Sequence, residues 1–422
     1  MQKGRRHQTA AFKFAPFSRK QQQVLTWWLP DCPYHTYDMI IADGSIRSGK
    51  TISMIDSFLT WSLYTFKGEA FIVSGRSAGA LKRNVLRPMW QILQAKGIGY
   101  YYNRSENYVD IGSNTYYLFG ASTEASQDVI QGLTAAGAYA DEAALFPQSF
   151  IEQMIGRCSV PGARIWMNCN PESPYHFLKT DYIDKAAEKH IVHLHFTMDD
   201  NLSLPPAVKE RYERMYSGIW YKRMVLGMWV LAEGLIYDMV SDAMLYNNDD
   251  LNKTMRSRCR RYIAVDYGTK NPMVFLDILD DGETIWVDRE YYWDSRAMQR
   301  QKTDAQYADD LADFIGDEYP DFIIIDPSAA SFKLVCQGKG FRVKDADNGV
   351  NDGIRVTAML ISQGRLKLNR KCTSTWAEFQ TYVWDEKAAA NGKEQPLKVN
   401  DHSMDAIRYY CKTMVAKWRL RE

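Results

Sequence analysis

The stretch Met39 to Thr51, MIIADGSIRSGKT, constrains the fold of this chain more than any other part of the sequence. Its apolar start has the composition of a buried strand end, and Gly44 to Thr51 match the pattern G-x-x-x-x-G-K-[ST]. Apolar residues between Ile52 and Leu63 then recur at helical spacing. A strand, a glycine-rich loop and a helix in this order predict a loop that binds phosphate groups.

Each position of this loop has a physical reason. Gly44 and Gly49 allow backbone torsions and a close approach that a Cβ would obstruct. The backbone N–H groups of the loop and the N-terminus of the helix are expected to face the phosphates. The loop residues that supply these N–H groups are Ser45, Ile46, Arg47 and Ser48. Lys50 is expected to contact the β- and γ-phosphate oxygens, and Thr51 to offer its hydroxyl to Mg²⁺. The loop therefore predicts binding of ATP with Mg²⁺.

A second stretch, AAGAYADE at 135–142, is a run of small and apolar residues that ends in two carboxylates. Such a strand predicts that Asp141 holds Mg²⁺, directly or through water, and that Glu142 orients and deprotonates the attacking water. It lies about 90 residues after the loop, and the two motifs together predict ATP hydrolysis. A third strand, 165–171, ends in Asn168 and Asn170, which either sense the γ-phosphate or serve as turn residues before Pro171.

Composition narrows the class of protein. With 422 residues, two or more domains are expected. The net charge of +1 gives no global attraction to nucleic acid, so a DNA partner needs local basic patches. Seven cysteines without a C-x-x-C pair indicate neither a zinc ribbon nor a disulfide scaffold and fit a reducing compartment. No run of about 18 apolar residues is present, so no membrane span is expected.

Three segments need separate interpretation. Residues 1–20 are basic and form either a solvated arm or an arm that contacts nucleic acid or a partner. Gln21 lies just upstream of the phosphate loop, where many nucleic-acid motors read the adenine edge, but a lone Gln also suits a surface helix. His193 and His195 alternate along a strand, and we expect a structural pair because no metal-ligand cluster lies beside them.

The sequence divides into an N-terminal α/β domain, 1–232, a polar and acidic linker, 233–256, and a second α/β domain, 257–422. In the second domain, Asp266 follows a hydrophobic strand, a hairpin with its turn at 280–282 comes next, and Asp326 ends a further buried strand. Asp405 lies on a helix near the C-terminus and shares one face with His402 or Asp401. This is the layout of an RNase H-like nuclease.

Three carboxylates brought together repel one another, so they are stable mainly with divalent cations between them. Two Mg²⁺ or Mn²⁺ ions about 4 Å apart activate water and stabilise the leaving oxygen of a phosphodiester. Asp321 is an alternative to Asp326, but it precedes its strand, which favours Asp326. From 361 to 422, twelve Lys and Arg against seven Asp and Glu leave a charge of 12 − 7 = +5, which suits a phosphate backbone.

With these features the chain resembles the large terminase subunit of tailed double-stranded DNA bacteriophages. The resemblance covers nearly the whole chain and rests on GSIRSGKT at 44–51, AYADEAA at 138–144, NCNP at 168–171, VLGMWVLAEGLIY at 225–237, AVDYG at 264–268, IIIDPSA at 323–329 and DHSMDAIRY at 401–409. It implies an ASCE-type, RecA-like P-loop ATPase domain followed by an RNase H-like nuclease domain. The order of ATPase and then metal nuclease is more specific than any single motif.

The resemblance also implies roles for single residues. Gln21 matches the adenine-reading Gln, Arg47 a loop arginine that acts as a finger, and Glu142 the catalytic Glu. Asn168 to Pro171 match the coupling motif, although Asn and Cys stand where Ser or Thr is frequent. The residues that match the nuclease triad are Asp266, Asp326 and Asp405.

At the level of function, the resemblance implies ATP-driven translocation of double-stranded viral DNA into a preformed capsid, with cleavage of the concatemer. It implies a small terminase subunit and a portal ring as partners, a homo-oligomeric ring during packaging that is compatible with a monomer in solution, and action in the host cytoplasm and at the capsid vertex. Two alternatives are a helicase–nuclease of DNA repair, which needs a second set of helicase motifs, and an ATP-gated DNA-binding scaffold, which the three intact aspartates argue against.

Overall fold

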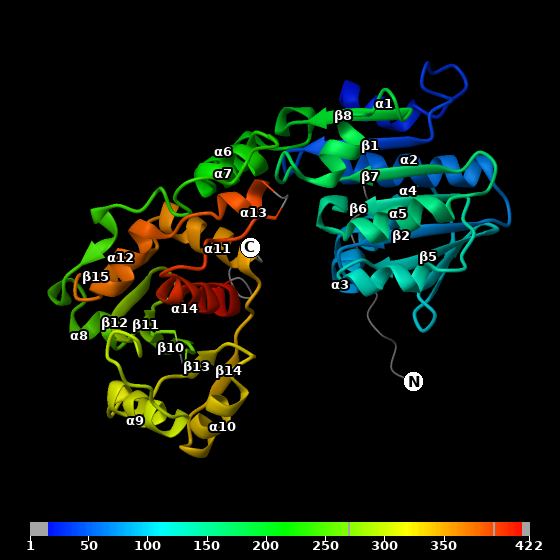
Figure 1. The fold of residues 1–422 in the computed structure, drawn as a ribbon. Helices are drawn as coiled ribbons and strands as arrows, with labels where there is room; N and C mark the ends of the chain where they lie inside the picture. Colours follow the sequence, from blue (N-terminus) through cyan, green and yellow to red (C-terminus); the bar gives the residue numbers. More distant parts are fainter. Residues whose placement is uncertain (1–15, 269–270, 391–392, 416–422) are drawn as a thin grey trace, which may run out of the picture. The chain divides into compact units, whose positions relative to one another are not determined.

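The computed structural model describes residues 16–268, 271–390 and 393–415. The chain forms two compact units, each built around one β-sheet (Figure 1). Unit 1 comprises Met1–Glu210 and Lys222–Val230, and unit 2 comprises Arg211–Tyr221 and Leu231–Glu422. The chain thus enters unit 2, returns to unit 1 for nine residues, and leaves again. Within the described residues, no helix combines the length and the apolar composition that crossing a membrane requires.

Unit 1 contains a sheet in the order β3-β4-β5-β2-β6-β7-β1-β8. Its strands are β1 (Met39–Gly44), β2 (Ala70–Gly75), β3 (Tyr100–Asn103), β4 (Tyr108–Ile111), β5 (Asn114–Gly120), β6 (Gly137–Asp141), β7 (Arg164–Asn168) and β8 (Ile191–Phe196). Strands β3, β4 and β5 pair antiparallel, with the β4–β5 hairpin turning at Gly112, and the other pairs are parallel. Strand β7 lies between β1, which leads into the phosphate loop, and β6, which ends in Asp141.

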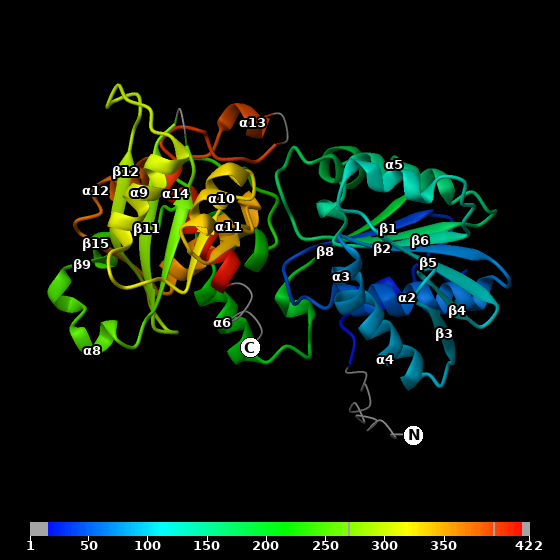
Figure 2. The same ribbon diagram turned by 90° about the horizontal axis from the view of Figure 1, so that it is seen from below.

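The helices of unit 1 cover both faces of this sheet. They are α1 (Arg19–Thr26), α2 (Lys50–Thr65), α3 (Ala78–Leu81), α4 (Arg87–Ala95) and α5 (Gln148–Arg157); α6 (Pro206–Met215) spans the boundary with unit 2, and α7 (Gly218–Trp220) lies beyond it. Figure 2 shows α5 on one side of the sheet and α2 with α4 on the other.

Unit 1 has two hydrophobic cores, because successive side chains of its strands point to opposite faces of the sheet. Ile40 on β1 packs into the same cluster as Phe58 of α2, whereas Ile41 packs into the opposite cluster with Ile151 of α5. Successive side chains of a strand point to opposite faces, so a continuous apolar strand is what a sheet covered on both sides requires. All four of these side chains are fully buried, and each contributes roughly 1.5–3 kcal/mol of transfer free energy.

Unit 2 contains a sheet in the order β14-β13-β10-β11-β12-β15-β9. Its strands are β9 (Leu245–Tyr246), β10 (Arg260–Asp266), β11 (Met273–Asp280), β12 (Ile285–Trp293), β13 (Phe322–Ile325), β14 (Val343–Asp345) and β15 (Leu366–Asn369). Its helices are α8 (Lys253–Arg256), α9 (Asp304–Ile315), α10 (Ala330–Gly338), α11 (Val350–Ser362), α12 (Thr373–Thr381), α13 (Glu386–Ala390) and α14 (His402–Tyr410). Strands β10, β11 and β12 pair antiparallel, as predicted from the hairpin.

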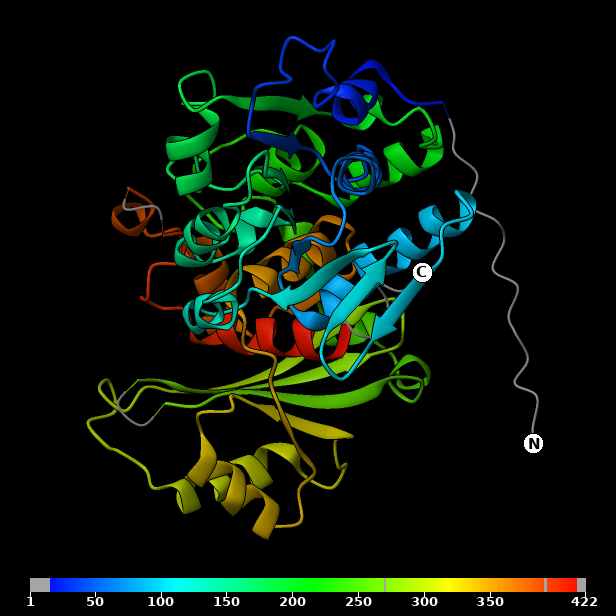
Figure 3. The ribbon, with the colours of Figure 1, turned by 90° about the vertical axis from the view of Figure 1, so that its right-hand side faces the viewer.

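Strand β13 pairs parallel to β10, and this pairing decides which residues share an edge of the sheet. Figure 3 shows α14 (red) on one face of the sheet, and α9 and α10 (yellow) on the other. Val265 points into the cluster formed with α9 and α10, whereas the ring of Tyr262 lies 5.3 Å from that of Tyr410 on α14. The α/β class predicted for both parts of the chain is therefore confirmed.

The stretch 233–256, expected to be a polar linker, lies within unit 2 and carries ordered structure. Strand β9 pairs with β15, and the Tyr246 ring lies 4.9 Å from that of Trp286. The Tyr246 hydroxyl donates to Asp288 Oδ1 at 2.8 Å, and Arg256 binds the same carboxylate with two hydrogen bonds at 2.7 and 2.8 Å. The polar side chains of this stretch bind backbone N–H groups at turns and helix starts. For example, the Asn247 N–H donates to Asp250 Oδ2 at 2.7 Å.

This packing predicts where a stable fragment of unit 2 begins. A chain from Leu231 to Glu422 should unfold at a clearly higher urea concentration than a chain from Lys253 to Glu422, because the shorter one lacks Tyr246. Loss of a buried aromatic side chain costs on the order of 3 kcal/mol. Urea titration followed by circular dichroism measures both midpoints, with Tyr246→Phe in the longer chain as the control that removes only the hydroxyl. Equal midpoints for the two fragments would contradict the prediction.

Candidate functional site

The phosphate loop joins β1 to α2, with Gly44 at φ +126° and Gly49 at φ +85°. A Cβ on Gly44 would collide with the backbone of Phe196 on β8, so the close approach that Gly44 allows is to a neighbouring strand. The Ser45 N–H donates to Phe196 O and the Ile46 N–H donates to Met224 O, both at 2.9 Å. These two N–H groups, predicted to face phosphate, therefore hold the start of the loop in place.

Lys50 lies beneath the loop and is only 7% exposed. Its ammonium donates to Gly44 O at 3.0 Å, Ser45 O at 2.6 Å, Ser48 Oγ at 3.1 Å and Asn170 Oδ1 at 3.3 Å. Burial lowers the pKa of Lys50 to about 8, although nearby acidic groups oppose the shift. A desolvated ammonium among neutral oxygens attracts an anionic phosphate oxygen more strongly than these oxygens, because two opposite full charges attract each other strongly where water is excluded.

Asn168, at the end of β7, connects the phosphate loop with the end of β6. Its Nδ2 lies 3.2 Å from Thr51 Oγ1 and 3.0 Å from Asp141 Oδ1, and its Oδ1 accepts the N–H of Glu142 at 2.9 Å. The Thr51 hydroxyl lies 3.4 Å from Asp141 Oδ1. Burial raises the pKa of Asp141, and hydrogen bonds from Asn168, Tyr139 and Thr51 oppose that rise. The structure thus brings together Thr51, Asp141 and both ends of the Asn168 amide.

Glu142 follows Asp141 with a left-handed backbone at φ +60°. A non-glycine residue in this conformation costs of order 1 kcal/mol, and such strain concentrates at functional sites. The side chain of Glu142 is half-buried beside Asp141. Asn168 binds the N–H of Glu142 at this turn.

Arg47 lies within the loop, and Gln21 reaches the loop from α1. Arg47 is exposed, has φ +57°, and its carbonyl accepts from Asn201 Nδ2 at 2.7 Å. Gln21 is 5% exposed on α1; its Oε1 accepts the Ser18 N–H at 2.9 Å, and its Nε2 lies 3.4 Å from Gly49 O. Gln21 therefore caps its own helix and also touches the loop. Its burial contradicts the alternative of a surface helix position, and its role at the adenine edge stays a prediction.

Asp43, the residue before Gly44, has a set of partners that sequence reasoning missed. His193 Nε2 lies 2.7 Å and His195 Nδ1 3.3 Å from Asp43 Oδ1, and Trp229 Nε1 donates to Oδ2 at 2.6 Å. Burial alone would raise the pKa of Asp43, but the bonds and charges of the two histidines outweigh it and hold the pKa well below its ordinary value. The two histidines thus share a carboxylate that the sequence did not place beside them, and their assignment as a structural pair stays a prediction. The missing signal was strand register, which sets Asp43 opposite His195.

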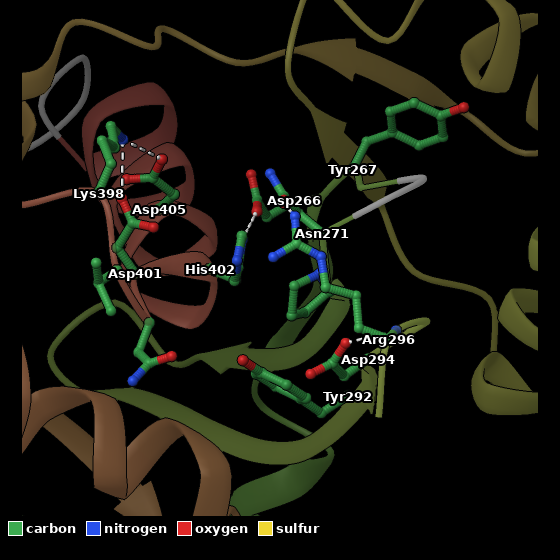
Figure 4. Close-up of a pocket in the computed structure, with 13 residues that line it drawn as sticks. Asp266, Tyr267, Asn271, Tyr292, Asp294, Arg296, Lys398, Asp401, His402 and Asp405 are labelled. Atoms are coloured by element: carbon green, nitrogen blue, oxygen red, sulfur yellow. Dashed lines mark hydrogen bonds and ion pairs between the residues drawn. The ribbon is translucent and has the colours of Figure 1, made fainter. Parts of the chain in front are cut away.

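A second candidate site is a cavity of about 430 Å³ in unit 2. Its residues come from the ends of β10 and β12, from the start of α14, and from the loops beside them (Figure 4). The lining residues are Asp266, Tyr267, Asn271, Pro272, Tyr292, Asp294, Arg296, Lys398, Val399, Asn400, Asp401, His402 and Asp405.

Asp266 ends β10, and its Oδ2 lies 2.9 Å from His402 Nδ1. Burial raises the pKa of Asp266, the negative charge of Asp405 adds to the rise, and His402 opposes it. Burial lowers the pKa of His402, but the bond to Asp266 together with the negative charges of Asp266, Glu378 and Asp401 outweighs it, so the net shift is upward. A carboxylate with a raised pKa is short of positive charge, which a bound cation would supply.

Asp326 follows β13 directly, next to Asp266, because Val265 and Ile325 are register partners on parallel strands. It accepts the Ser328 N–H at 2.8 Å and Asn348 Nδ2 at 3.2 Å. Burial favours a higher pKa, but these bonds hold the pKa of Asp326 below its ordinary value. Asp326 does not line the cavity; Tyr409 of α14 is within electrostatic reach of Asp266, Asp405 and Asp326 alike. Asp321 lies at the other end of β13, where its N–H donates to Arg261 O.

Asp405 lies on α14 with its two oxygens bound to different cations. Arg408 Nη2 donates to Oδ1 at 2.7 Å, and Lys398 Nζ lies 3.2 Å from Oδ2. Among the residues that the structure describes, no three His, Cys, Asp or Glu side chains lie close enough together to hold a metal ion as they stand. Asp401 and Asp405 are instead compensated by cations of the chain itself, Lys398 and Arg408.

Comparison with known proteins now bears on both sites. Residues 41–241 match the family model "Terminase large subunit, T4likevirus-type, N-terminal". The large terminase of a thermophilic bacteriophage is 46% identical, with a TM-score of 0.90, over 95% of this chain and 100% of that chain. The chain belongs to the large terminase family.

Two further similarities agree with this assignment. The same thermophilic-phage terminase in complex with ATP-γ-S is 44% identical, with a TM-score of 0.87, and again covers 95% of this chain and 100% of that one. The large terminase subunit of Escherichia phage T5 is 26% identical over 234 residues, which are 52% of this chain and 50% of that protein. The match to the phage T5 terminase thus spans half of its length.

In this member of the terminase family, Glu378 on α12 positions the helix that carries His402 and Asp405. It is 3% exposed, and its Oε2 accepts the N–H groups of Ser403 at 2.7 Å and Met404 at 3.2 Å. A carboxylate at a helix N-terminus satisfies N–H groups that lack partners within the helix and opposes the helix dipole. The Tyr292 hydroxyl, from the cavity wall, donates to Oε1 at 3.0 Å. No sequence motif indicated Glu378.

Glu378 predicts a pH-dependent stability. Burial raises its pKa from an ordinary 4.5 to about 7, so the folded chain binds a proton that the unfolded chain releases between these values. The free energy of unfolding should therefore fall as pH rises from about 4.5 to 7, by roughly 3 kcal/mol for this group. Glu378→Gln should remove this part of the pH dependence and be more stable than wild type at pH 8. Urea unfolding of both proteins at pH 5 and pH 8 checks this, and identical pH slopes would refute it.

Proposed function

We propose that this chain hydrolyses ATP in unit 1 to move double-stranded viral DNA into a preformed capsid, and cuts the DNA concatemer with a metal-dependent nuclease in unit 2. The observation that carries the proposal is the pair of separate sites on one chain. One is the Thr51–Asn168–Asp141 network beside Lys50, and the other is the carboxylate cavity at the end of β10. The similarity to the thermophilic-phage large terminase covers 95% of this chain, and it supports the proposal that both sites serve DNA packaging.

For ATP hydrolysis, the proposal assigns each residue a role from its position. Lys50 binds the β- and γ-phosphate oxygens in place of the loop carbonyls, and Thr51 with Asp141 holds Mg²⁺, which neutralises the developing charge. Glu142 orients and deprotonates the attacking water. Asn168 contacts Thr51, Asp141 and the Glu142 backbone, so it is placed to couple the nucleotide to the rest of the unit. Structures of the thermophilic-phage protein with ADP and with ATP-γ-S support nucleotide binding by unit 1.

Two residues beside the nucleotide site, Gln21 on α1 and Arg47 in the loop, complete this assignment. Gln21 reads the adenine edge from its place beside Gly49, and exposed Arg47 acts as the finger. We propose that the ATPase domain corresponds to residues 1–232 and the nuclease domain to 257–422, with 233–256 packed on the nuclease sheet.

For DNA cleavage, the carboxylates Asp266, Asp326 and Asp405 would hold two Mg²⁺ or Mn²⁺ ions, with His402 as a further ligand or as the group that orients a water. The donors are carboxylate oxygens, which suit these hard cations. When bound, such ions activate water and stabilise the leaving oxygen. Asp326 is assigned rather than Asp321 because it shares the sheet edge of Asp266. Glu378 holds the start of α14, and Arg408 fixes the rotation of the Asp405 carboxylate.

The partners follow from the family. We propose that the chain acts with a small terminase subunit and a portal ring, assembles as a homo-oligomeric ring during packaging, and works in the host cytoplasm and at the capsid vertex.

The ATPase assignment predicts different defects for two variants. Lys50→Ala should weaken both binding and turnover, because it removes the charge that contacts the phosphates. Glu142→Gln should still bind ATP but hydrolyse it at least ~10²-fold more slowly, the scale of a lost general base. Glu152→Gln, the same change at an exposed position on α5, is the matched control. Nucleotide binding and steady-state hydrolysis decide the matter, and near wild-type turnover by Glu142→Gln would reject the role of Glu142.

The nuclease assignment predicts that cutting and ATP hydrolysis are separable. Asp266→Ala and Asp326→Ala should abolish metal-dependent nicking of plasmid DNA yet leave ATP hydrolysis largely intact, since two-metal cleavage needs no nucleotide. Asp321→Ala, at the opposite end of β13, is the matched control and should still cut. Nicking with Mn²⁺ and no ATP is the assay, and crystals soaked in Mn²⁺ should show anomalous density beside Asp266. Loss of cutting in Asp321→Ala with retention in Asp326→Ala would reverse the assignment.

A further inference from the structure

Lys398 is a cation of unit 2 that the proposed reaction does not use. Its ammonium lies in the carboxylate cavity, 2.9 Å from Asp401 Oδ2 and 3.2 Å from Asp405 Oδ2 (Figure 4). Both carboxylates are nearly buried, at 5% and 8% exposure. One ammonium thus compensates two desolvated negative charges at the start of α14.

The two carboxylate oxygens of Asp405 bind two different cations. Arg408, itself 2% exposed, binds Asp405 Oδ1 and also donates to Asn348 O, both at 2.7 Å. Arg408 is therefore a permanent structural partner that fixes the carboxylate plane. The other oxygen, Oδ2, is left for a cation in the cavity, and in this structure that cation is the ammonium of Lys398.

Lys398 can move away from Asp405 more easily than Arg408 can. Its side chain is 58% exposed, and it belongs to a stretch of irregular backbone just before α14. Val399 beside it is 56% exposed, and Asn400 has a left-handed backbone at φ +51°. The neighbouring Leu397 N–H donates to Val383 O at 2.9 Å, so the backbone is tethered while the long side chain can swing.

We propose that Lys398 is a tethered competitor of the catalytic metal ion, occupying the Asp401–Asp405 oxygens until a divalent cation displaces it. The inference rests on the nuclease function proposed above. An ammonium in contact with Asp405 Oδ2 repels a divalent cation that approaches the same oxygen and takes up part of its negative charge, so the two cations compete for it. The apparent metal affinity is then the intrinsic affinity multiplied by the fraction of molecules in which Lys398 has already left the carboxylates. Lys398 thereby raises the metal concentration at which cutting begins.

The test is direct titration of Mn²⁺ into the full chain without nucleotide or DNA, with bound Mn²⁺ measured by electron paramagnetic resonance. Lys398→Met keeps the length of the side chain and removes the ammonium. It should bind Mn²⁺ about three- to fivefold more tightly than wild type, the upper part of the range expected when a partly exposed ion pair is removed. Lys398→Arg, which keeps a cation that can bind the carboxylates, should stay within about twofold of wild type. Thermal unfolding of each variant verifies that the fold is retained.

A matched control separates competition at Asp405 from general electrostatics. Arg296→Met removes one positive charge from the same cavity lining, but Arg296 bonds to Asn271 rather than to Asp401 or Asp405. Its Mn²⁺ affinity should change much less than that of Lys398→Met. Equal tightening in both variants, or no tightening in Lys398→Met, would overturn the proposal.

Failure of the underlying nuclease assignment gives a different result. Asp405→Asn should lose Mn²⁺ binding if this cavity is the metal site. If wild type and Asp405→Asn bind Mn²⁺ equally, the cavity is not the metal site, and the nuclease assignment falls together with the role of Lys398. If Asp405→Asn loses binding while Lys398→Met matches wild type, only the role of Lys398 is rejected.

Discussion

Parallel pairing of strands is the constraint on which both sites depend. Neighbouring parallel strands end at the same edge of a sheet, so residues far apart in the sequence meet there. In unit 1, β1, β7 and β6 lie side by side, and their ends deliver the phosphate loop, Asn168 and Asp141. In unit 2, the parallel pair β10 and β13 delivers Asp266 and Asp326. Side-chain chemistry then acts between groups that strand register has already placed within reach.

Charge compensation within each unit is the second requirement. The buried Asp43 has two histidines and Trp229 as partners, and Asp405 has Arg408 and Lys398. Burial costs a carboxylate several kcal/mol of hydration, and such partners offset this loss. These partners also hold the geometry: Trp229 belongs to the segment Lys222–Val230, which returns to unit 1 and whose Met224 carbonyl binds the phosphate loop. The start of the loop is thus supported from β8 and from this returning segment.

Some contacts at the sites could not be read from the sequence because they depend on register and on loops. Period-2 alternation put His193 and His195 on one face, but only the pairing of β1 with β8 set His195 opposite Asp43. Glu378 lies 24 residues before His402 and meets α14 only because α12 packs against it. The stretch 233–256 was expected to be a linker from its acidic composition, yet its Asn and Asp side chains cap turns and Tyr246 is buried.

The sequence by itself determined the elements that carry local signals. The phosphate loop, the strand ending in Asp141–Glu142, the hairpin of unit 2 and the α/β class of both units follow from glycine spacing, apolar runs and turn residues, which act over a few positions. Only the tertiary structure decided which strand lies between β1 and β6, which end of β13 meets Asp266, and which cations bind Asp405. The physical reason is that strand order and side-chain pairing depend on packing between distant segments, and a carboxylate finds its partner through space rather than along the chain.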